Sequence, residues 1–476
     1  MKLIDIKNGI NPQWAEKGYQ MPQFDIEAVR EKTHAEPAWV HFGAGNLFRA
    51  FPAAILQQVL DSGKYDKGVI VAEGFDFEII DKAYAPYDDL SLLVCLQSDG
   101  NIQKKVIASV TESLKADAQF PEDWARLAEI FANPSLQMIS FTITEKGYGV
   151  APADLERGLK PALIMGKVTL LLYERFLAGK LPLTLQSMDN CSHNGDKVKA
   201  AVIAYAARWA QEGLVPKEFL DYVQDPAKVT YPWSMIDKIT PRPDEKVQKM
   251  LAEDGFEDNY TIITDKRTYT APFVNAEETE YLVIEDNYTN GRPPLELGGV
   301  MYVDRETVDK VERMKVCTCL NPLHTAMSIY GCLLGYDLIS AEMADEDIRG
   351  LITKLGHLEA MPVVADPGVL KPADFIDAVL NRRLPNPFMP DAPQRIATDT
   401  SQKLPIRFGE TIKAYRERGL DMDDLVLLPL VLAGYARYIR GIDDEGRAFE
   451  PSPDPLLEEL RAIVAPLEVK EGEQDF

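Results

Sequence analysis

Three short segments of the sequence concentrate polar side chains more densely than a folded core requires. They are Ser140–Tyr148 (SFTITEKGY), Asp189–Gly195 (DNCSHNG) and Lys315–His324 (KVCTCLNPLH). The first two follow predicted strands, and in open α/β sheets ligands bind beyond the carboxyl ends of the strands. Carboxamide groups can stabilise the alkoxide that forms when a hydride reaches a ketone, and a lysine with apolar neighbours can act as the proton donor. We therefore interpret these segments as candidate parts of an active site.

A glycine turn between a strand and a helix adds a second kind of signal. The apolar run Trp39–Phe42 leads into Gly43-Ala-Gly45, and an amphipathic helix pattern follows. Gly43 permits a tight turn, and Gly45 lets a pyrophosphate approach the start of the helix. Phe48 replaces the third glycine of the usual motif, so taken alone the pattern fits an ordinary strand–helix turn equally well. The residues predicted to contact a dinucleotide here are Gly43, Gly45, Asn46 and Leu47.

The next predicted strand, Gly68–Ala72, leads into two acidic residues, Glu73 and Asp76. Their spacing from the glycine turn is that of the acid that binds the ribose diol of the adenosine. A carboxylate there would repel a 2′-phosphate and so favours NAD over NADP. The sequence does not distinguish Glu73 from Asp76, and either can equally be a solvated surface acid.

The elements that must position these residues follow two different patterns along the chain. Strand patterns alternate with helical patterns in the first part, which predicts a largely parallel, doubly wound α/β sheet. From Thr307 onward almost every segment has a helical pattern. We predict a Rossmann-like, NAD-binding N-terminal domain at 1–290 and an all-α, substrate-binding C-terminal domain at 291–476. The further strand signals in the first part are 91–96, 105–110, 137–144 and 183–188.

Bulk properties restrict the class of protein. A chain of 476 residues is too long for one ordinary core. The net charge of −24 argues against nucleic acid as a partner, and an anionic substrate would need a local positive pocket. We find no membrane-length apolar run and no secretory signal, and the five cysteines fit reduced thiols. We expect a cytoplasmic protein that is a monomer or a weak homo-oligomer.

Seven motifs resemble those of the mannitol dehydrogenase family of polyol-specific long-chain dehydrogenases, and they span most of the chain in the family's order. That resemblance implies a Rossmann-like domain, a helical domain, an active site between them, NAD as cofactor and no catalytic zinc. The five histidines also lack the spacing of a zinc site. The motifs are FGAGNLFRA (42–50), SFTITEKGY (140–148), DNCSHNG (189–195), YPWSMIDKITP (231–241), VIEDNYTNGRP (283–293), MKVCTCLNPLH (314–324) and DTSQKLP (399–405).

The resemblance also implies roles for single residues. Lys315 would be the general acid/base, and Asn190 and Asn321 would hold the reacting oxygen. His324 would orient the substrate and the lysine, and Asp237 would belong to the substrate site.

One spacing departs from the family's commonest form, in which asparagine follows the lysine after five residues. Here Asn321 is six residues after Lys315, although His324 keeps its spacing of three from Asn321. On a regular helix the extra residue rotates Lys315 by about 100°, unless a bulge or the helix start absorbs it. Pro322 suits a first helical turn, which would leave Lys315 in an extended segment. Lys146 is the alternative proton donor.

The segment 394–407 is basic in a strongly acidic chain. Arg395 and Lys403 match family residues that reach the far end of the substrate. Because arginine binds a carboxylate in a bidentate manner, we expect reduction of D-fructuronate to D-mannonate with NADH. Reduction of tagaturonate, or oxidation of mannitol or another polyol, is the alternative within the family. The two cations can also simply offset Asp391 and Asp399.

Two other classes of function are compatible with parts of the pattern. A lyase could use Lys315 as a Schiff base, but the glycine turn and its acidic second strand argue against this. A redox-sensing module could hold NAD without turnover, but the polar residues Asn190, Asn321 and His324 argue against that.

Overall fold

The computed structural model describes residues 1–443 and 445–466, and the chain forms two compact units. Unit 1 comprises Met1–Leu96 and Asn101–Val308, and unit 2 comprises Gln97–Gly100 and the chain from Asp309. Residues 291–308, which the prediction assigns to the second domain, therefore pack with unit 1. The reason is β15 (Met301–Val303), which pairs with β14 (Tyr281–Glu285) in a three-stranded sheet that also contains β10 (Ser234–Asp237).

The centre of unit 1 is a six-stranded sheet in the order β6-β3-β2-β7-β8-β9, and every neighbouring pair is parallel. This is the strand order of a doubly wound Rossmann fold, as the alternation of strand and helix patterns predicts. The strands are β2 (Trp39–Phe42), β3 (Val69–Glu73), β6 (Val110–Lys115), β7 (Met138–Phe141), β8 (Leu183–Ser187) and β9 (Val229–Thr230).

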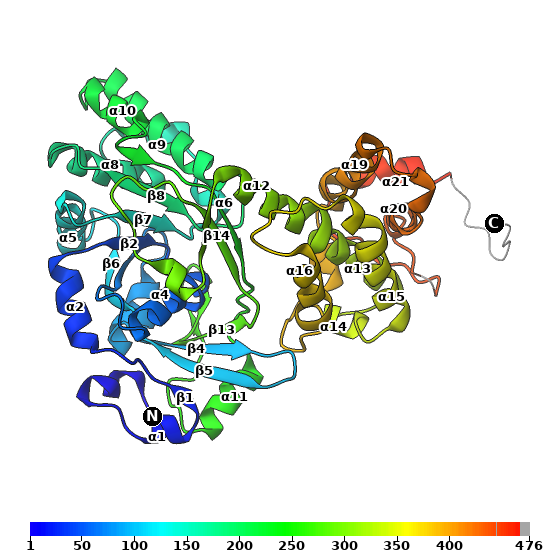
Figure 1. The fold of residues 1–476 in the computed structure, drawn as a ribbon, viewed down its shortest axis with the longest axis horizontal. Helices are drawn as coiled ribbons and strands as arrows, with labels where there is room; N and C mark the ends of the chain where they lie inside the picture. The colour runs from blue at the N-terminus through cyan, green and yellow to red at the C-terminus, as the bar shows by residue number, and fades with distance from the viewer. Residues whose placement is uncertain (444, 467–476) are drawn as a thin grey trace. The chain divides into compact units, whose positions relative to one another are not determined.

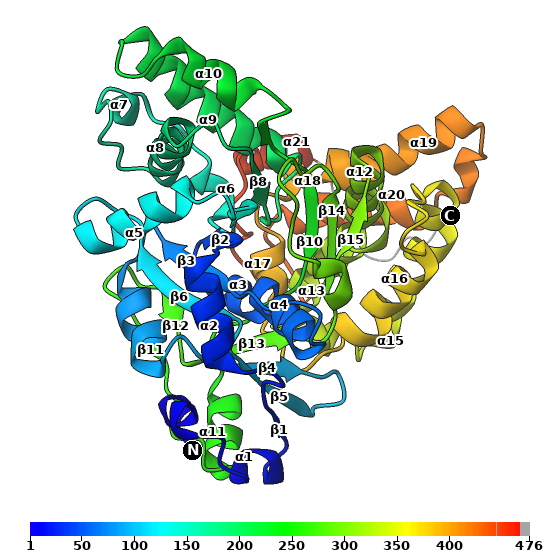
Figure 2. The same cartoon turned by 60° about the vertical axis from the view of Figure 1, so that its left-hand side comes forward.

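Helices cover both faces of this sheet, so its strands are buried on both sides (Figures 1 and 2). In β2, Val40 and Phe42 enter the core formed with α5, α8 and α9, whereas Trp39 enters the core formed with α4. This two-sided burial explains why the strand is a continuous apolar run rather than an alternating one. The helices are α2 (Ile26–Ala35), α4 (Pro52–Asp61), α5 (Pro121–Ala132), α8 (Ile164–Leu177), α9 (Asn194–Gln211) and α10 (Lys217–Gln224).

Two of the predicted strands do not join the parallel sheet. The segment 91–96 forms β4, which pairs antiparallel with β5 (Ile102–Ile107) in a separate sheet. The predicted strand 105–110 covers the end of β5 and the start of β6. A connection as short as residues 97–101 produces an antiparallel hairpin, because a parallel crossover needs a dozen or more residues. The other strands of this sheet are β1 (Tyr19–Gln20) and β13 (Phe273–Glu277), and β11 (Ile262–Ile263) pairs with β12 (Tyr269–Thr270).

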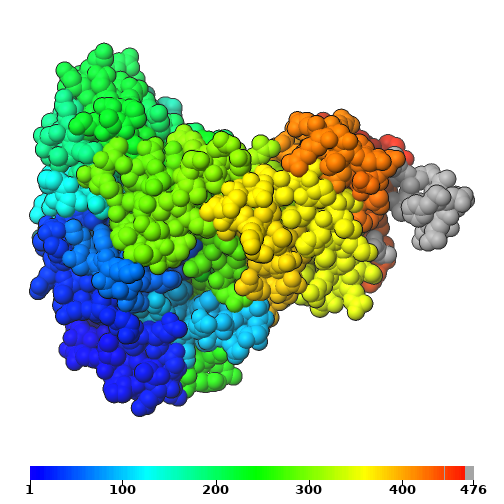
Figure 3. Space-filling view, viewed as in Figure 1, coloured from blue at the N-terminus to red at the C-terminus, as the bar shows by residue number. Residues whose placement is uncertain are grey.

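The amino terminus is attached to the surface of unit 1. The ammonium group of Met1 donates a hydrogen bond to the carbonyl of Gly255, at 2.8 Å, just after α11 (Glu245–Glu253). The first residues therefore lie against α11, where the space-filling view shows them in dark blue (Figures 1 and 3).

Unit 2 is helical, as predicted, and within its described residues the only β-type pairing is the single bridge between Ile442 and Ala448. The helical path through residues 311–334 contains a π-helical turn at Lys315–Cys319. The α-helices, of which α12 begins within unit 1, are α12 (Arg305–Met314), α13 (Asn321–Leu334), α14 (Ile339–Glu342), α15 (Glu346–Lys354), α16 (Pro372–Ala378), α17 (Pro393–Ile396), α18 (Thr400–Leu404), α19 (Glu410–Arg418), α20 (Leu427–Tyr438) and α21 (Leu457–Val464).

Across the two described stretches of chain, no helix combines the length and the apolar character that crossing a bilayer requires.

Candidate functional site

The two glycines of the turn after β2 differ in whether the protein's own packing requires them. Gly43 has φ +106°, and a Cβ atom there would lie 2.3 Å from the carbonyl oxygen of Thr142, so only glycine fits. Gly45 has φ −76°, and a Cβ atom there would meet nothing within 4 Å. The protein's own packing therefore does not require glycine at position 45. The missing side chain leaves open space at the start of α3 (Asn46–Ala50).

Phe48 explains how the turn functions without a third glycine. Its ring stacks on the His41 ring with centroids 4.2 Å apart, and both side chains are fully buried. Burial lowers the pKa of His41 to about 3. The neutral imidazole lies 2.6 Å from Ser140 Oγ and 2.8 Å from Thr142 Oγ1. An aromatic stack thus packs the helix on the strand where other dinucleotide folds use glycine.

A cavity of about 510 Å³ opens beside this turn, within the size range of cofactor and ligand pockets. Four of the six residues predicted to bind the cofactor line it: Gly43, Gly45, Glu73 and Asp76. Thr142, Thr144 and Lys146 of the first polar segment line it as well.

Glu73 and Asp76 both line the cavity but hold different partners. Oε2 of Glu73 accepts a hydrogen bond from the Ala44 amide at 2.8 Å, and its Oε1 accepts from the amides of Phe75 and Asp76. In Asp76, as far as the described residues go, only Oδ2 accepts hydrogen bonds, from the hydroxyls of Thr264 and Thr268 at 2.6 Å each. Glu73 therefore ties the glycine turn to the end of β3, whereas Asp76 keeps one carboxylate oxygen for another donor.

Asn46 and Leu47 lie outside the lining of this cavity. Oδ1 of Asn46 accepts a hydrogen bond from the buried Arg49 guanidinium at 2.8 Å, and its Nδ2 donates to the Tyr269 carbonyl at 3.3 Å. Leu47 packs against the core on the α4 side of the sheet. Both side chains hold the turn in place in this structure.

The first two polar segments meet at Asp189. Its carboxylate accepts hydrogen bonds from the amides of Ile143 and Thr144, at 2.9 and 3.0 Å, and from the Tyr148 hydroxyl at 2.6 Å. Burial raises the pKa of Asp189, although these hydrogen bonds oppose the shift. Sequence reasoning assigned no role to Asp189 or Tyr148. The sequence does carry a signal for them, because Tyr148 lies in the motif 140–148 and Asp189 in the motif 189–195.

The same strand end is connected to the strand that carries Asp237. The Asn194 side chain donates to the carbonyls of Asp189 and Ser234, at 3.0 Å each, and Ser234 begins β10. Asp237 ends β10 and is buried, whereas Asn190 is exposed next to Asp189.

In unit 2 the extra residue between Lys315 and Asn321 forms a π-helical turn. The amide of Leu320 donates to the Lys315 carbonyl, five residues earlier, at 3.1 Å. Lys315 is buried and continues directly from α12, so the expectation of an extended segment is wrong. Pro322 instead occupies the first turn of α13, immediately after the π turn. A π turn accommodates one extra residue within a helix, so it removes the rotation that a regular helix would impose.

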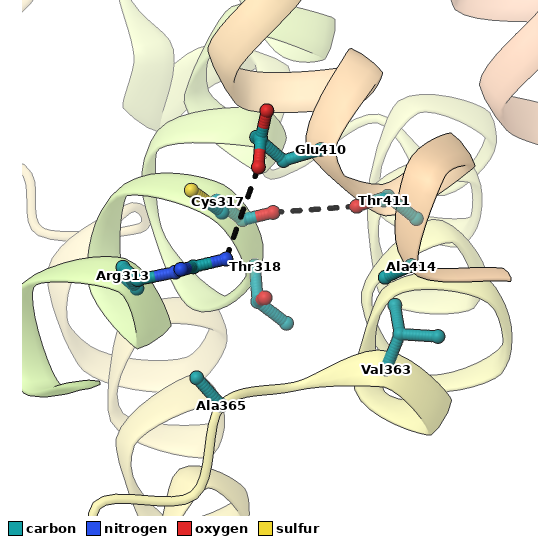
Figure 4. Close-up of a pocket in the computed structure, with 8 residues that line it drawn as sticks. All are labelled: Arg313, Cys317, Thr318, Val363, Ala365, Glu410, Thr411 and Ala414. Atoms are coloured by element: carbon teal, nitrogen blue, oxygen red, sulfur yellow. Dashed lines mark hydrogen bonds and ion pairs between the residues drawn. The ribbon is translucent and has the colours of Figure 1, made fainter. Parts of the chain in front are cut away.

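Contacts from α19 support this π turn (Figure 4). The Thr411 hydroxyl donates to the Cys317 carbonyl at 3.4 Å, and Arg313 forms an ion pair with Glu410 at 3.8 Å. These residues surround a small cavity of about 30 Å³ on the side shown in the figure. A carbonyl displaced from regular helical bonding thus finds a side-chain partner.

His324 belongs to an ion-pair cluster with Asp391 and Arg395. The sequence itself indicated only the Arg395–Asp391 pair, as the alternative in which the cations offset nearby acids. Its Nε2 lies 3.4 Å from Asp391 Oδ2, and Arg395 pairs with the other oxygen of the same carboxylate. Burial lowers the pKa of His324, and Asp391 partly offsets that shift. Burial alone would raise the pKa of Asp391, but the hydrogen bonds from His324 and Arg395 outweigh it and the pKa is lowered. One carboxylate thus holds two of the predicted site residues.

The remaining cations of this segment are Lys403 and Arg407. The Lys403 ammonium donates to the carbonyls of Ile396 and Thr398, at 2.8 and 2.5 Å. Nη1 of Arg407 donates to the Thr325 hydroxyl and to the Asn321 carbonyl, the latter at 3.4 Å. Burial lowers the pKa of Lys403, and the neighbouring Arg407 charge adds to this.

Among the described residues, no three histidine, cysteine or acidic side chains are grouped as metal ligands.

Models of two families match the chain. One is described as the mannitol dehydrogenase Rossmann domain and matches residues 37–297, and the other, the mannitol dehydrogenase C-terminal domain, matches residues 307–474. A D-mannonate oxidoreductase of Thermotoga maritima is 52% identical over 97% of this chain and 87% of its own length. A polyol:NADP oxidoreductase of Gluconobacter oxydans is 28% identical over 94% of this chain and 87% of its own.

Two solved structures share the fold over almost the whole chain. The substrate-free form of a D-sorbitol dehydrogenase has a TM-score of 0.79 and 26% identity, and covers 93% of this chain and 88% of its own. Mannitol 2-dehydrogenase of Pseudomonas fluorescens, in a ternary complex with NAD and D-mannitol, has a TM-score of 0.71 and 25% identity. This alignment covers 96% of this chain and 89% of that structure.

Proposed function

Because the chain belongs to the mannitol dehydrogenase family, we propose that it is an NAD-dependent, zinc-independent secondary-alcohol dehydrogenase that interconverts D-fructuronate and D-mannonate. The observation that carries the substrate is the 52% identity, over nearly the full chain, to a D-mannonate oxidoreductase. The glycine-lined cavity of unit 1 and the cations of unit 2 supply the two kinds of site that this reaction needs.

The cavity beside the glycine turn suits a dinucleotide. Open space at Gly45 lets a phosphate approach the backbone, and the free oxygen of Asp76 is available to a ribose hydroxyl. Glu73 holds the turn through backbone amides and so acts on the cofactor only indirectly. We assign the backbone of Asn46 and Leu47, at the start of α3, to the contact with the cofactor. Bound NADH supplies the hydride that reduces the ketone.

The chain's own residues donate a proton and hydrogen bonds to the reacting oxygen of the substrate. We assign proton donation to the Lys315 ammonium, which leaves a neutral amine as the substrate oxygen becomes a hydroxyl. The amide groups of Asn190 and Asn321 donate to that oxygen while it carries negative charge. His324, held by Asp391, orients the substrate, and Asp237 binds a substrate hydroxyl. Arg395 and Lys403 are assigned to the far end of the substrate, and Lys146 remains the alternative proton donor.

The decisive experiment is a screen of NADH oxidation with D-fructuronate, D-tagaturonate and D-fructose, each with and without EDTA. We expect D-fructuronate to be the best substrate and EDTA to leave the rate unchanged. Activity on D-fructose alone would remove the uronate assignment, and loss of activity in EDTA would contradict a zinc-independent mechanism.

Replacement of Lys315 tests the assignment of the proton donor. Lys315→Ala should lower kcat by about 10²- to 10⁴-fold, which is the usual contribution of general acid catalysis. Near-normal turnover would transfer the role to Lys146, and Lys146→Ala is the matched variant. Borohydride trapping of substrate on Lys315 without nucleotide would instead indicate a Schiff-base lyase.

Oxidation of a polyol is the second candidate activity, because the solved structures that share the fold are a sorbitol and a mannitol dehydrogenase. The same screen run in reverse, with NAD and D-mannitol or D-mannonate, separates the two. We place the protein in the cytoplasm, in keeping with its five free cysteines, as a monomer or a weak homo-oligomer.

A further inference from the structure

The three cations of the segment 395–407 differ in the partners that they already hold. Arg395 is two-thirds exposed and pairs with Asp391, so its charge is compensated within the protein. The Lys403 ammonium is engaged by two backbone carbonyls. Arg407 differs from both, because among the described residues it has no carboxylate partner and only one of its three guanidinium nitrogens donates hydrogen bonds.

The guanidinium of Arg407 has no compensating charge in the part of the chain that the structure describes. In the described parts of the chain it makes hydrogen bonds only through Nη1, both to uncharged oxygens, and no carboxylate lies within ion-pair distance. The group is half-buried, and burial lowers the pKa of Arg407 to about 10. Removing a cation from water without an anionic partner is costly, and Nε and Nη2 remain as donors. A bound anion would supply the missing charge.

The position of Arg407 connects it with the proposed chemistry. Its two acceptors, Asn321 and Thr325, are one turn apart at the start of α13, and His324 belongs to the same turn. Its charge also acts on the imidazole of His324. An anion held by Arg407 therefore lies beside the residues assigned to the substrate oxygen.

We propose that Arg407 binds the carboxylate of an open-chain keto-sugar acid and so makes the site selective for sugar acids over neutral ketoses and polyols. This inference rests on the proposed function. The planar guanidinium suits a carboxylate through two parallel N–H donors, which a neutral hydroxymethyl group cannot match. Arg395 and Lys403, assigned to the same far end of the substrate, then bind the hydroxyl groups next to that carboxylate.

The test compares the full-length wild type with Arg407→Met, Arg407→Lys and the control Arg416→Met. Arg416 is exposed on α19 and has no assigned role. Steady-state rates with NADH are measured for D-fructuronate and for D-fructose. For Arg407→Met we expect kcat/KM with D-fructuronate to fall about 100-fold, mainly through KM, and kcat/KM with D-fructose to change by less than about threefold. For Arg407→Lys, kcat/KM with D-fructuronate should be intermediate, because lysine keeps the positive charge but lacks the two parallel N–H donors.

Equal losses for both substrates would overturn the inference, because they would show that Arg407 only supports α13. An unchanged preference for D-fructuronate would also overturn it. If Arg407→Met does not fold, thermal-shift titrations of wild type and Arg407→Lys with D-mannonate and D-mannitol replace it. The ratio of the two affinities should then fall by at least about tenfold, and an unchanged ratio contradicts the inference. If the wild type does not reduce D-fructuronate at all, the proposed function fails instead.

Discussion

At the scale of single residues, the two acids at and just after the end of β3 differ in their hydrogen-bond partners. Glu73 uses both oxygens on backbone amides, including that of Ala44 within the glycine turn. Asp76 is held by two threonine hydroxyls on one oxygen and lines the same cavity. The free oxygen makes Asp76 the residue of the pair that can accept a hydrogen bond from ribose.

We therefore predict that Asp76→Asn relaxes the preference for NADH. The amide oxygen still accepts from Thr264 and Thr268, so the fold is kept, but the charge that repels a 2′-phosphate is lost. The ratio of kcat/KM for NADPH to that for NADH should rise about 10- to 100-fold, the usual range for a hydrogen bond to a charged group. Glu73→Gln is the comparison variant and should lower stability more than it changes this ratio. A larger ratio change in Glu73→Gln would reverse the assignment.

Asp391 offers a second prediction at this scale. Asp391→Asn removes the charge that partly offsets the effect of burial on His324, so the pKa of His324 should fall further. It also releases Arg395, and we expect kcat/KM to fall about tenfold, with the pH profile displaced towards acid. The control is Asp377→Asn, because Asp377 pairs with His357 at 3.7 Å in an exposed position. An unaltered pH profile in Asp391→Asn would show that Asp391 only packs the segment.

At the scale of elements, the π turn at Lys315–Cys319 is the feature that reconciles the unusual lysine spacing with a continuous helical path. An insertion in a regular helix would change the direction of every residue before it. A π turn confines the extra residue to a single helical turn. The Thr411 hydroxyl donates a hydrogen bond to the Cys317 carbonyl within that turn.

Deletion of Val316 tests this explanation. The shortened segment should become α-helical and keep Lys315 and Asn321 in their present relation, so kcat should fall by less than about tenfold. Insertion of one alanine after Cys317 should instead rotate Lys315 by about 100° and lower kcat to the level of Lys315→Ala. Steady-state rates of the two variants measure these losses of kcat, and crystal structures show the path of the helix. A larger loss of kcat in the deletion than in the insertion would refute the role of the π turn.

At the scale of the whole molecule, stability should depend on a buried acid in unit 2. Glu342 is fully buried, neither carboxyl oxygen has a hydrogen-bond partner among the described residues, and burial raises the pKa of Glu342 to about 9. Its carboxyl packs against Gly331 of α13, where a Cβ atom would lie 2.3 Å from Oε1. The acid is therefore neutral in the folded protein at pH 7.

This arrangement fixes the sign of a pH effect. Between the ordinary carboxyl pKa and about 9, the folded state holds a proton that the unfolded state has released, so the free energy of unfolding falls as pH rises. The slope is at most about 1.4 kcal/mol per pH unit for one group. Glu342→Gln should reduce the slope by up to that amount between pH 6 and 8, measured by urea unfolding.

The chain supplies an internal control for that measurement. All five tryptophans lie in unit 1, so their fluorescence reports on unit 1, whereas far-ultraviolet circular dichroism also follows the helices of unit 2. The change in slope should appear in the dichroism signal. An identical slope in Glu342→Gln and wild type would mean that the carboxyl is ionised or solvated in the folded protein.

The sequence alone determined those features that depend on local pattern. The alternation of strands and helices, the glycine turn after Trp39–Phe42 and the helical character of unit 2 follow from periodicity and backbone sterics, which short stretches of chain carry themselves. The family resemblance followed from motif order, and the family models confirm it.

Only the tertiary structure decided which polar side chains already have hydrogen-bond or ion-pair partners and which can still bind a ligand. It showed that Glu73 is engaged by backbone amides, that Asp391 joins His324 to Arg395, and that Arg407 has no carboxylate partner within the two described stretches. It also showed that the extra residue after Lys315 is absorbed by a π turn. Hydrogen-bond partners and burial come from segments far apart in the chain, so residue types and spacing could nominate these side chains but not say what each one holds.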